Sequence, residues 1–324
     1  MNSMATKFVV IITAFFVGVL NVSVILADSK RSIEAAPAGS LWAHDNLHVW
    51  EVANRDLNKR GPDERAQMLK RLGIRHYAYL SRQDPYGKEP DINTSQLVID
   101  AEIEAMQRNG LDIRAWYFWL NTDDPKSDPN VSKTFEAFKR YHIHPQVWVP
   151  QSHAQAEMAY SVFPKTPEEQ KQRVIREAER IRLFVKLAEP YGLKVDLYNH
   201  GGWFGKEENE LDILDRLKEL GVTNVGLVFN FAHASYMYTD LQQVFAQMWR
   251  RIKPYVVAVN MDVNPRYLEM LRIVEDSGWK GPVGILARGG DTDVDVRYNL
   301  AALDFLATEL RRVPSQEALH TSLP

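Results

Sequence analysis

Cysteine is absent from the sequence, which excludes disulfide bonds, thiolate metal ligands and a cysteine nucleophile. Gly-rich phosphate-binding strings are absent as well, because neither G-x-G-x-x-G nor G-x-x-x-x-G-K-[ST] occurs. No G-x-S-x-G string marks a serine nucleophile, and no internal repeat or long low-complexity tract is present. The sequence therefore offers no sign of nucleotide binding or of thiol or serine chemistry.

An excess of charge of either sign is also missing. The chain has 39 Lys and Arg residues against 42 Asp and Glu residues, a formal net charge of −3. Nucleic acids and anionic membrane surfaces attract basic patches, and this balance provides none. A small molecule is the expected partner.

The N-terminus has the layout of a secretory signal. Lys7 precedes an apolar run over 8–26, and Ala27 is followed by polar residues. We predict a signal peptide over 1–27 and a linker over 28–40, which places the globular part outside the cytoplasm. The alternative is a membrane anchor, because an apolar run of 19 residues is long enough to cross a bilayer.

From residue 41 onward, short segments rich in Val, Ile, Tyr and Trp alternate with longer amphipathic segments. This alternation is typical of parallel strands joined by helices. The expected strands are 47–52, 74–80, 113–120, 146–149, 194–198, 225–229, 256–259 and 282–286. The expected helices are 62–72, 94–108, 131–141, 167–191, 207–220, 241–252, 265–277 and 294–311. Eight strands and eight helices predict a single-domain (β/α)8 TIM barrel over 41–312 with a tail at 313–324, rather than an open doubly wound sheet.

Polar residues follow several of the expected strands, where a barrel exposes its catalytic groups. Two histidines, His200 and His233, come just after strands five and six, and Gly201 and Gly202 follow the first of them. The other candidates at these strand ends are Asn199, Asn230, Asn260, Asp262 and Arg288. We expect them to line one pocket.

Aromatic residues dominate the first four strands. Aromatic rings stack on the apolar faces of sugar rings, although aromatics on barrel strands more often pack in the core. The candidates for a sugar-binding wall are Trp50, Tyr79, Trp116 and Trp148. This inventory suggests a carbohydrate substrate.

The strings LYNHGGW, VFNFAHA, VVAVNMDV and GPVGILARGG resemble strand ends of the xylose-isomerase-like barrels, also described as sugar phosphate isomerase/epimerase proteins. The resemblance covers about 41–311 and implies a TIM barrel that acts on sugars. Asn199, His200, Gly201, His233 and Asp262 match the family pattern.

The metal ligands that the resemblance implies are largely replaced. Tyr198 stands where the family has Glu, Asn230 where it has Asp, and Asn260 where it has His. Leu286 or Ala287 stands at the last Glu position. Divalent ions such as Mn²⁺ or Mg²⁺ need anionic oxygen ligands, so the identity of any metal stays open. A rearranged metal site would use His200, His233 and Asp262.

Three functions remain open. The first is proton abstraction and transfer on a sugar or keto-sugar, by isomerisation, epimerisation or elimination, with His200, His233 and Asp262 as catalytic residues and with or without a metal. The second is hydrolysis of a glycoside by paired carboxylates, for which Glu51, Asp262 and Asp291 are available. The third is carbohydrate binding without catalysis. Sequence alone does not identify the sugar or the oligomeric state.

Overall fold

The computed structural model describes residues 33, 35–81, 96–119, 122–151, 162–287 and 290–312. The predicted signal peptide, residues 28–32 and 34 of the linker, the C-terminal tail and Arg288 lie outside these residues. No helix among the described residues is long and apolar enough to cross a membrane.

Eight parallel strands close into one barrel, as the sequence predicts. Each strand pairs with the next, and β1 pairs with β8, with Leu47 opposite Val283 and Trp50 opposite Leu286. The strands are β1 (Leu47–Trp50), β2 (His76–Ser81), β3 (Asp112–Phe118), β4 (Gln146–Val149), β5 (Val195–Tyr198), β6 (Gly226–Asn230), β7 (Val256–Met261) and β8 (Val283–Leu286).

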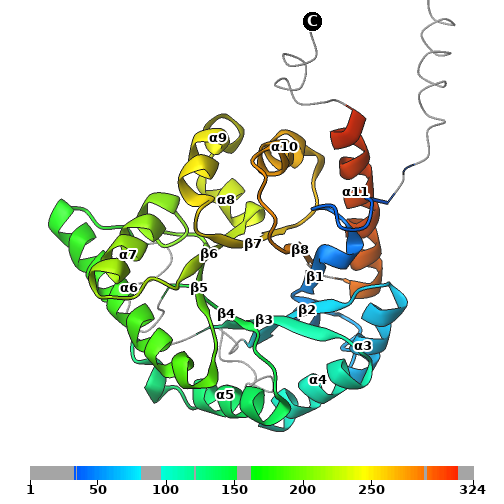
Figure 1. Cartoon of the computed structure of the whole chain (residues 1–324), viewed down its shortest axis with the longest axis horizontal. Helices are drawn as coiled ribbons and strands as arrows, with labels where there is room; N and C mark the ends of the chain where they lie inside the picture. The colour runs from blue at the N-terminus through cyan, green and yellow to red at the C-terminus, as the bar shows by residue number, and fades with distance from the viewer. Residues whose placement is uncertain are drawn as a thin grey trace, which may run out of the picture. The chain divides into compact units, whose positions relative to one another are not determined.

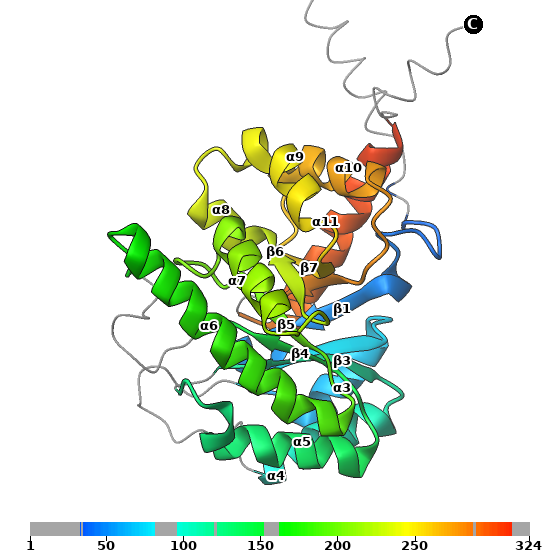
Figure 2. The ribbon, with the colours of Figure 1, turned by 60° about the vertical axis from the view of Figure 1, so that its left-hand side comes forward.

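Helices form a ring around the strands (Figure 1). They are α2 (Val52–Arg55), α3 (Pro62–Arg71), α4 (Gln96–Arg108), α5 (Pro129–Tyr141), α6 (Pro167–Ala188), α7 (Glu207–Glu219), α8 (Phe231–Met237), α9 (Leu241–Ile252), α10 (Leu268–Asp276) and α11 (Thr292–Arg312). Short 3-10 helices lie at His44–Asn46, Pro125–Ser127, Glu189–Tyr191 and Pro265–Tyr267. Figure 2 shows the long helix α6 crossing the outer side of the barrel beside α7.

Local sequence sets many of the helix ends. Thr166 accepts a hydrogen bond from the Glu169 N–H and so caps α6, and Pro167 occupies the first helical position. The glycines expected at helix C-termini adopt positive φ, between 67° and 80°, a region that glycine enters without a steric penalty. They are Gly73, Gly110, Gly192, Gly221 and Gly278.

Several strand ends differ from the prediction by one or two residues, and two of these differences bear on the site. Strand one ends at Trp50, because Glu51 adopts a left-handed conformation (φ 68°) and starts the short helix α2, which the sequence analysis missed. Strand seven continues to Met261, so Asn260 lies inside the strand and not after it.

The interior of the barrel holds an aromatic layer. Trp50 packs against Trp148 and Tyr117 with ring centroids 5.4 and 5.2 Å apart, and Tyr198 lies 5.1 Å from Tyr117. All four side chains are almost completely buried. This layer, which we call the aromatic floor (Trp50, Tyr117, Trp148 and Tyr198), fills the barrel below the mouth.

Polar groups lie on the other side of the aromatic floor, at the first inward positions of the strands. His48 on β1 donates from Nε2 to Oδ1 of Asn260 at 2.9 Å, and burial lowers the pKa of His48 to about 3. Asp196 on β5 accepts the Gly226 N–H at 2.9 Å, and burial raises its pKa to about 7. Both side chains are therefore neutral when buried in the folded protein at mildly acidic pH.

These two groups give opposite pH dependences of stability. Above about pH 3.8 the unfolded chain releases the Asp196 proton, whereas the folded protein keeps it up to about pH 7. The contribution of Asp196 to the unfolding free energy is therefore complete below pH 3.8 and is lost as the pH rises to about 7. The unfolded chain protonates His48 below about pH 6.5 and the folded protein does not, so the His48 contribution is lost as the pH falls toward 3. Between roughly pH 4 and 6.5, one contribution to the unfolding free energy rises as the other falls, so the two changes with pH cancel.

Replacing Asp196 by Asn should expose the His48 contribution. Asn keeps an oxygen for the Gly226 N–H but does not titrate. Relative to the parent, we expect the variant to gain up to about 4 kcal/mol in unfolding free energy between pH 4 and pH 7. Urea unfolding at several pH values measures this difference, and an unchanged pH slope would show that Asp196 is ionised in the folded barrel.

Candidate functional site

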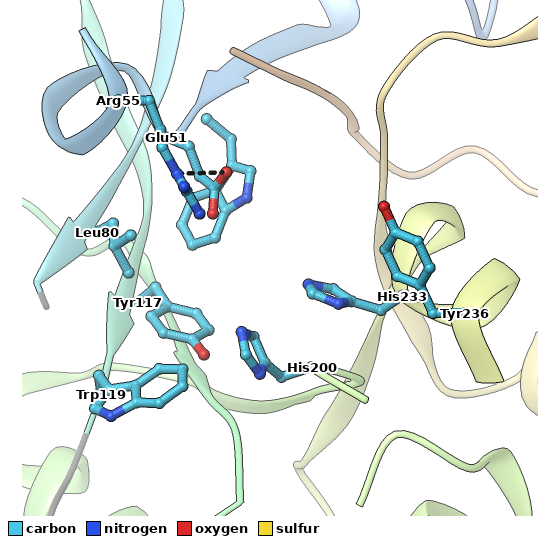
Figure 3. Close-up of a pocket in the computed structure, with 9 residues that line it drawn as sticks. Glu51, Arg55, Leu80, Tyr117, Trp119, His200, His233 and Tyr236 are labelled. Atoms are coloured by element: carbon cyan, nitrogen blue, oxygen red, sulfur yellow. Dashed lines mark ion pairs between the residues drawn. The ribbon is translucent and has the colours of Figure 1, made fainter. Parts of the chain in front are cut away.

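Two histidines meet at the C-terminal mouth of the barrel. His200 follows β5, and His233 lies in the first turn of α8, directly after β6. Their ring centroids are 4.6 Å apart, with the rings inclined at 44° (Figure 3). Both side chains are partly exposed. The structure therefore brings together the two residues that the sequence analysis placed at neighbouring strand ends.

Asparagines hold this pair from below. Asn230 caps α8, because its Oδ1 accepts the N–H groups of Ala232 at 2.9 Å and His233 at 3.3 Å. Its Nδ2 donates to the Tyr198 hydroxyl at 2.6 Å, and its own N–H donates to Oδ1 of Asn199 at 2.7 Å. Asn199 and Asn230 are buried and do not line the cavity. Asn230 therefore helps to fix the position of the His233 backbone.

We expect Asn230→Ala to reduce both stability and turnover. The variant loses the cap of α8, typically about 1 kcal/mol, and the hydrogen bond that the Asn230 side chain donates to the Tyr198 hydroxyl. Because α8 carries His233, we expect a fall in kcat. Asn264→Ala is the matched control, since Asn264 caps the 3-10 helix at Pro265–Tyr267 away from the cavity. If both variants kept full kcat, Asn230 would have no role in placing His233.

The histidines open onto a cavity of about 280 Å³, close to the lower end of the range of small-molecule sites. Trp119 lies edge-on to His200, with ring centroids 4.8 Å apart, and Tyr117 lies 6.3 Å from the same ring. The described residues that line the cavity are Trp50, Glu51, Arg55, Leu80, Tyr117, Trp119, His200, His233 and Tyr236. This is a small pocket with aromatic and polar walls.

Figure 3 shows Glu51 and Arg55 on the opposite side of the cavity from the two histidines. Glu51 Oε2 and Arg55 Nε are 3.7 Å apart and form an ion pair across one turn of α2. Glu51 is a sequence candidate only as a hydrolase carboxylate, and Arg55 and Tyr236 are pocket residues that the sequence did not predict. The signal for Arg55 was its spacing of four residues from Glu51, which becomes informative only once α2 is known.

Several predicted residues lie elsewhere. Tyr79 and Trp116 point outward to the helices, with their rings 4.2 Å apart, because they occupy outward positions on β2 and β3. Trp148 belongs to the aromatic floor, and Asn260 is bonded to His48 beneath it. Asp262 lies after β7, with its Oδ1 3.4 Å from the Tyr267 hydroxyl, and does not line the cavity. Of the four predicted aromatic residues, Trp50 alone is among the described residues on the pocket wall.

The residues present do not fit the divalent metal that the family resemblance implies. In the described part of the chain, no group of three or more His, Asp or Glu side chains could hold a metal ion, so His200, His233 and Asp262 do not form a three-ligand site. Asn230 caps a helix, Tyr198 accepts the hydrogen bond of Asn230, and Leu286 packs in the apolar interior. Neutral groups that are already engaged are poor replacements for the anionic ligands of Mg²⁺ or Mn²⁺.

No protein-family model matches the sequence, and no curated protein matches it. Solved structures do match the barrel. The 3-keto-D-glucoside 4-epimerase from E. coli in its apo form has a TM-score of 0.58 at 13% identity, over 81% of this chain and 99% of that one. A putative xylose isomerase from Rhodospirillum rubrum has a TM-score of 0.57 at 12% identity, over 83% and 99%.

A D-psicose 3-epimerase, solved in the presence of D-fructose, has a TM-score of 0.52 at 13% identity, over 82% of this chain and 96% of that one. These three similar structures are sugar epimerases or isomerases by description. The described barrel therefore has the fold of the xylose-isomerase-like sugar isomerases and epimerases, the fold that the sequence resemblance predicted.

Proposed function

We propose that this protein is a carbohydrate-active enzyme that transfers a proton next to the carbonyl group of a sugar or keto-sugar. The observation that carries the proposal is the pair His200 and His233, 4.6 Å apart on a pocket with aromatic walls at the barrel mouth. Histidine titrates near neutral pH, so one imidazole can accept a proton while the other donates one.

The chemistry needs two coordinated proton movements. A neutral imidazole removes the proton from the carbon beside the carbonyl, and the electron pair moves toward the carbonyl oxygen. The protonated imidazole donates to that oxygen and gives an enediol. Protonation of the former carbonyl carbon, with loss of the hydroxyl proton from its neighbour, gives isomerisation. Protonation of the original carbon from the opposite face, with loss of the proton from the former carbonyl oxygen, gives epimerisation. Departure of a group from the next carbon gives elimination.

The similar structures support the substrate class. One is a 3-keto-D-glucoside 4-epimerase and another a D-psicose 3-epimerase, and both descriptions name a keto-sugar or its product. The cavity volume suits a ligand of monosaccharide size. A small carbohydrate is therefore the substrate that we propose for this pocket.

Hydrolysis by paired carboxylates has less support. Such a mechanism needs two carboxyl groups that face each other across the scissile bond, about 5 to 10 Å apart. Glu51 is the single carboxylate among the described residues of the pocket wall, while Asp291 pairs with Arg60 at 2.7 Å. Binding without catalysis would not need two adjacent histidines.

Hydrogen exchange tests the proposal directly. The protein is incubated in D₂O with D-fructose, D-psicose, D-xylose and a 3-keto-glucoside, and proton NMR follows the carbon-bound hydrogens. We expect deuterium to enter at the carbon beside the carbonyl in at least one sugar. Release of the aglycone without exchange would show a hydrolase, and binding without exchange would show a binding protein.

We also propose that the protein is exported, on the basis of Lys7, the apolar run over 8–26 and Ala27. N-terminal sequencing of protein from the native host should start near residue 28. An intact Met1 chain in the membrane fraction would instead show an anchor.

A further inference from the structure

A charged pair occupies the side of the cavity that the proton-transfer chemistry leaves unused. Glu51 starts α2 in a left-handed conformation, and Arg55 lies one turn later. Left-handed backbone is rare for residues other than Gly, Asn and Asp, and such positions concentrate at functional sites. The turn places both side chains on the cavity wall opposite His200 and His233 (Figure 3).

The Arg55 side chain is held loosely enough to take a ligand. The 3.7 Å between Arg55 Nε and Glu51 Oε2 is longer than a hydrogen bond. Within the described ranges the Arg55 side chain makes no hydrogen bond, and it is 45% exposed. Its N–H donors can therefore bind a molecule in the cavity. The Glu51 carboxylate, which is 15% exposed, has lone pairs for more than one donor.

The two groups have complementary hydrogen-bonding capacity. A guanidinium only donates, and an ionised carboxylate only accepts, whereas each sugar hydroxyl does both. Neighbouring hydroxyls of a sugar can thus bind one to Arg55 and the other to Glu51. A carboxylate or phosphate on the ligand would gain from Arg55 but would be repelled by Glu51.

We propose that Glu51 and Arg55 bind two adjacent free hydroxyls and thereby select neutral sugars with an unsubstituted vicinal diol. This inference rests on the proposed function, because it assumes a carbohydrate in the pocket. The diol is held on the α2 side, so the carbonyl end of the sugar faces His200 and His233. Tyr117 and Trp119 flank the space between the two sides.

The experiment measures binding without turnover. Saturation-transfer NMR is recorded for the full chain with the methyl glycosides of glucose, galactose, mannose and xylose, and with glucuronate as the acidic probe. The best-binding glycoside is then compared with its monodeoxy analogues. We expect E51Q and R55M each to weaken binding of that glycoside by about 10- to 100-fold, the effect of losing a hydrogen bond to a charged group.

The analogue that lacks the hydroxyl bound by Glu51 should bind the parent as weakly as the complete sugar binds E51Q, and should lose nothing further in E51Q. The analogue that lacks the neighbouring hydroxyl should behave in the same way toward R55M. The matched control is E179Q with R182M, which removes an ion pair on the outer surface of α6 and should leave binding unchanged. Unchanged sugar binding in E51Q and R55M would overturn the inference, as would tighter binding of glucuronate than of every neutral glycoside.

The kinetic constants separate this inference from the proposed function. For an exchangeable sugar, E51Q should raise KM and leave kcat nearly unchanged. A collapse of kcat at constant KM would make Glu51 a base and overturn its assignment to the diol. Sugar binding that depends on the pair, without any deuterium exchange, would overturn the proposed function alone, and failure of every sugar to bind would overturn both.

Discussion

Alanine at His200 or at His233 is expected to lower turnover of a sugar substrate by about 10² to 10⁴-fold, the usual cost of losing a general acid or base. Both side chains are partly exposed at the rim, and neither belongs to the aromatic floor. Substitutions at such positions usually change stability by about 0.5 kcal/mol or less. The loss should therefore appear in kcat with little change in the melting temperature.

The control is His144→Ala, because His144 lies on the surface and contacts the Tyr191 carbonyl at 3.1 Å, away from the cavity. Turnover is measured for the three variants with and without added Mn²⁺ or Zn²⁺, beside thermal melts. Near-parental activity in both His200→Ala and His233→Ala would show that the histidines are structural. If activity depended on added metal in the parent and bound metal were lost in both variants, a metal-assisted mechanism would replace the one proposed here.

Gly284→Ala should strongly destabilise the barrel. A Cβ at this position would overlap Oδ1 of Asn260 and Nε2 of His48, the two atoms of the buried hydrogen bond beneath the aromatic floor. Overpacking costs about 1 to 3 kcal/mol, and breaking a buried polar pair costs a similar amount. We expect a loss of about 3 to 5 kcal/mol, which lowers the melting temperature by about 10 °C.

Gly61→Ala is the matched control, because Gly61 has a φ of −66° and an added Cβ would meet only Glu64 Oε2, at 3.8 Å. Adding Asn260→Ala to Gly284→Ala removes one of the overlapping side chains. The double variant should therefore lose less unfolding free energy than the sum of the losses in the two single variants. A melting temperature for Gly284→Ala close to that of Gly61→Ala would show that the interior has room for the methyl group.

Sequence periodicity was sufficient for the architecture because each strand and helix has its own local signal. Gln146–Val149 and Leu241–Ile252 match the predicted bounds, and the eight strands follow the expected order. The short helices α2 and α8 were missed, since a helix of one or two turns has too few residues to show a period of 3.6. The start of α8 is set by Asn230, whose side chain accepts the N–H groups of Ala232 and His233.

The aromatic wall was predicted only in part. Successive side chains of a strand point alternately into the barrel and toward the helices, and this alternation, the strand parity, decides which rings face inward. Tyr117 and Trp119 face the cavity, while Trp116 and Phe118 pack against the helices. On β2 the small and aliphatic residues Ala78 and Leu80 face inward and the tyrosines face outward. Composition alone does not fix parity, because aromatic residues suit both the interior of a barrel and its helix-facing side. The histidines were located because they follow strand ends, where parity matters less.

The aromatic floor has a consequence for the order of events in turnover. Trp50, Tyr117, Trp148 and Tyr198 close the barrel beneath the histidines, so the pocket has no exit through the far end of the barrel. In the proposed enzyme, substrate and product would both pass through the mouth of the barrel, so a product molecule must leave before the next substrate can enter. Product should therefore inhibit competitively with respect to substrate, and the rate of its departure becomes part of kcat.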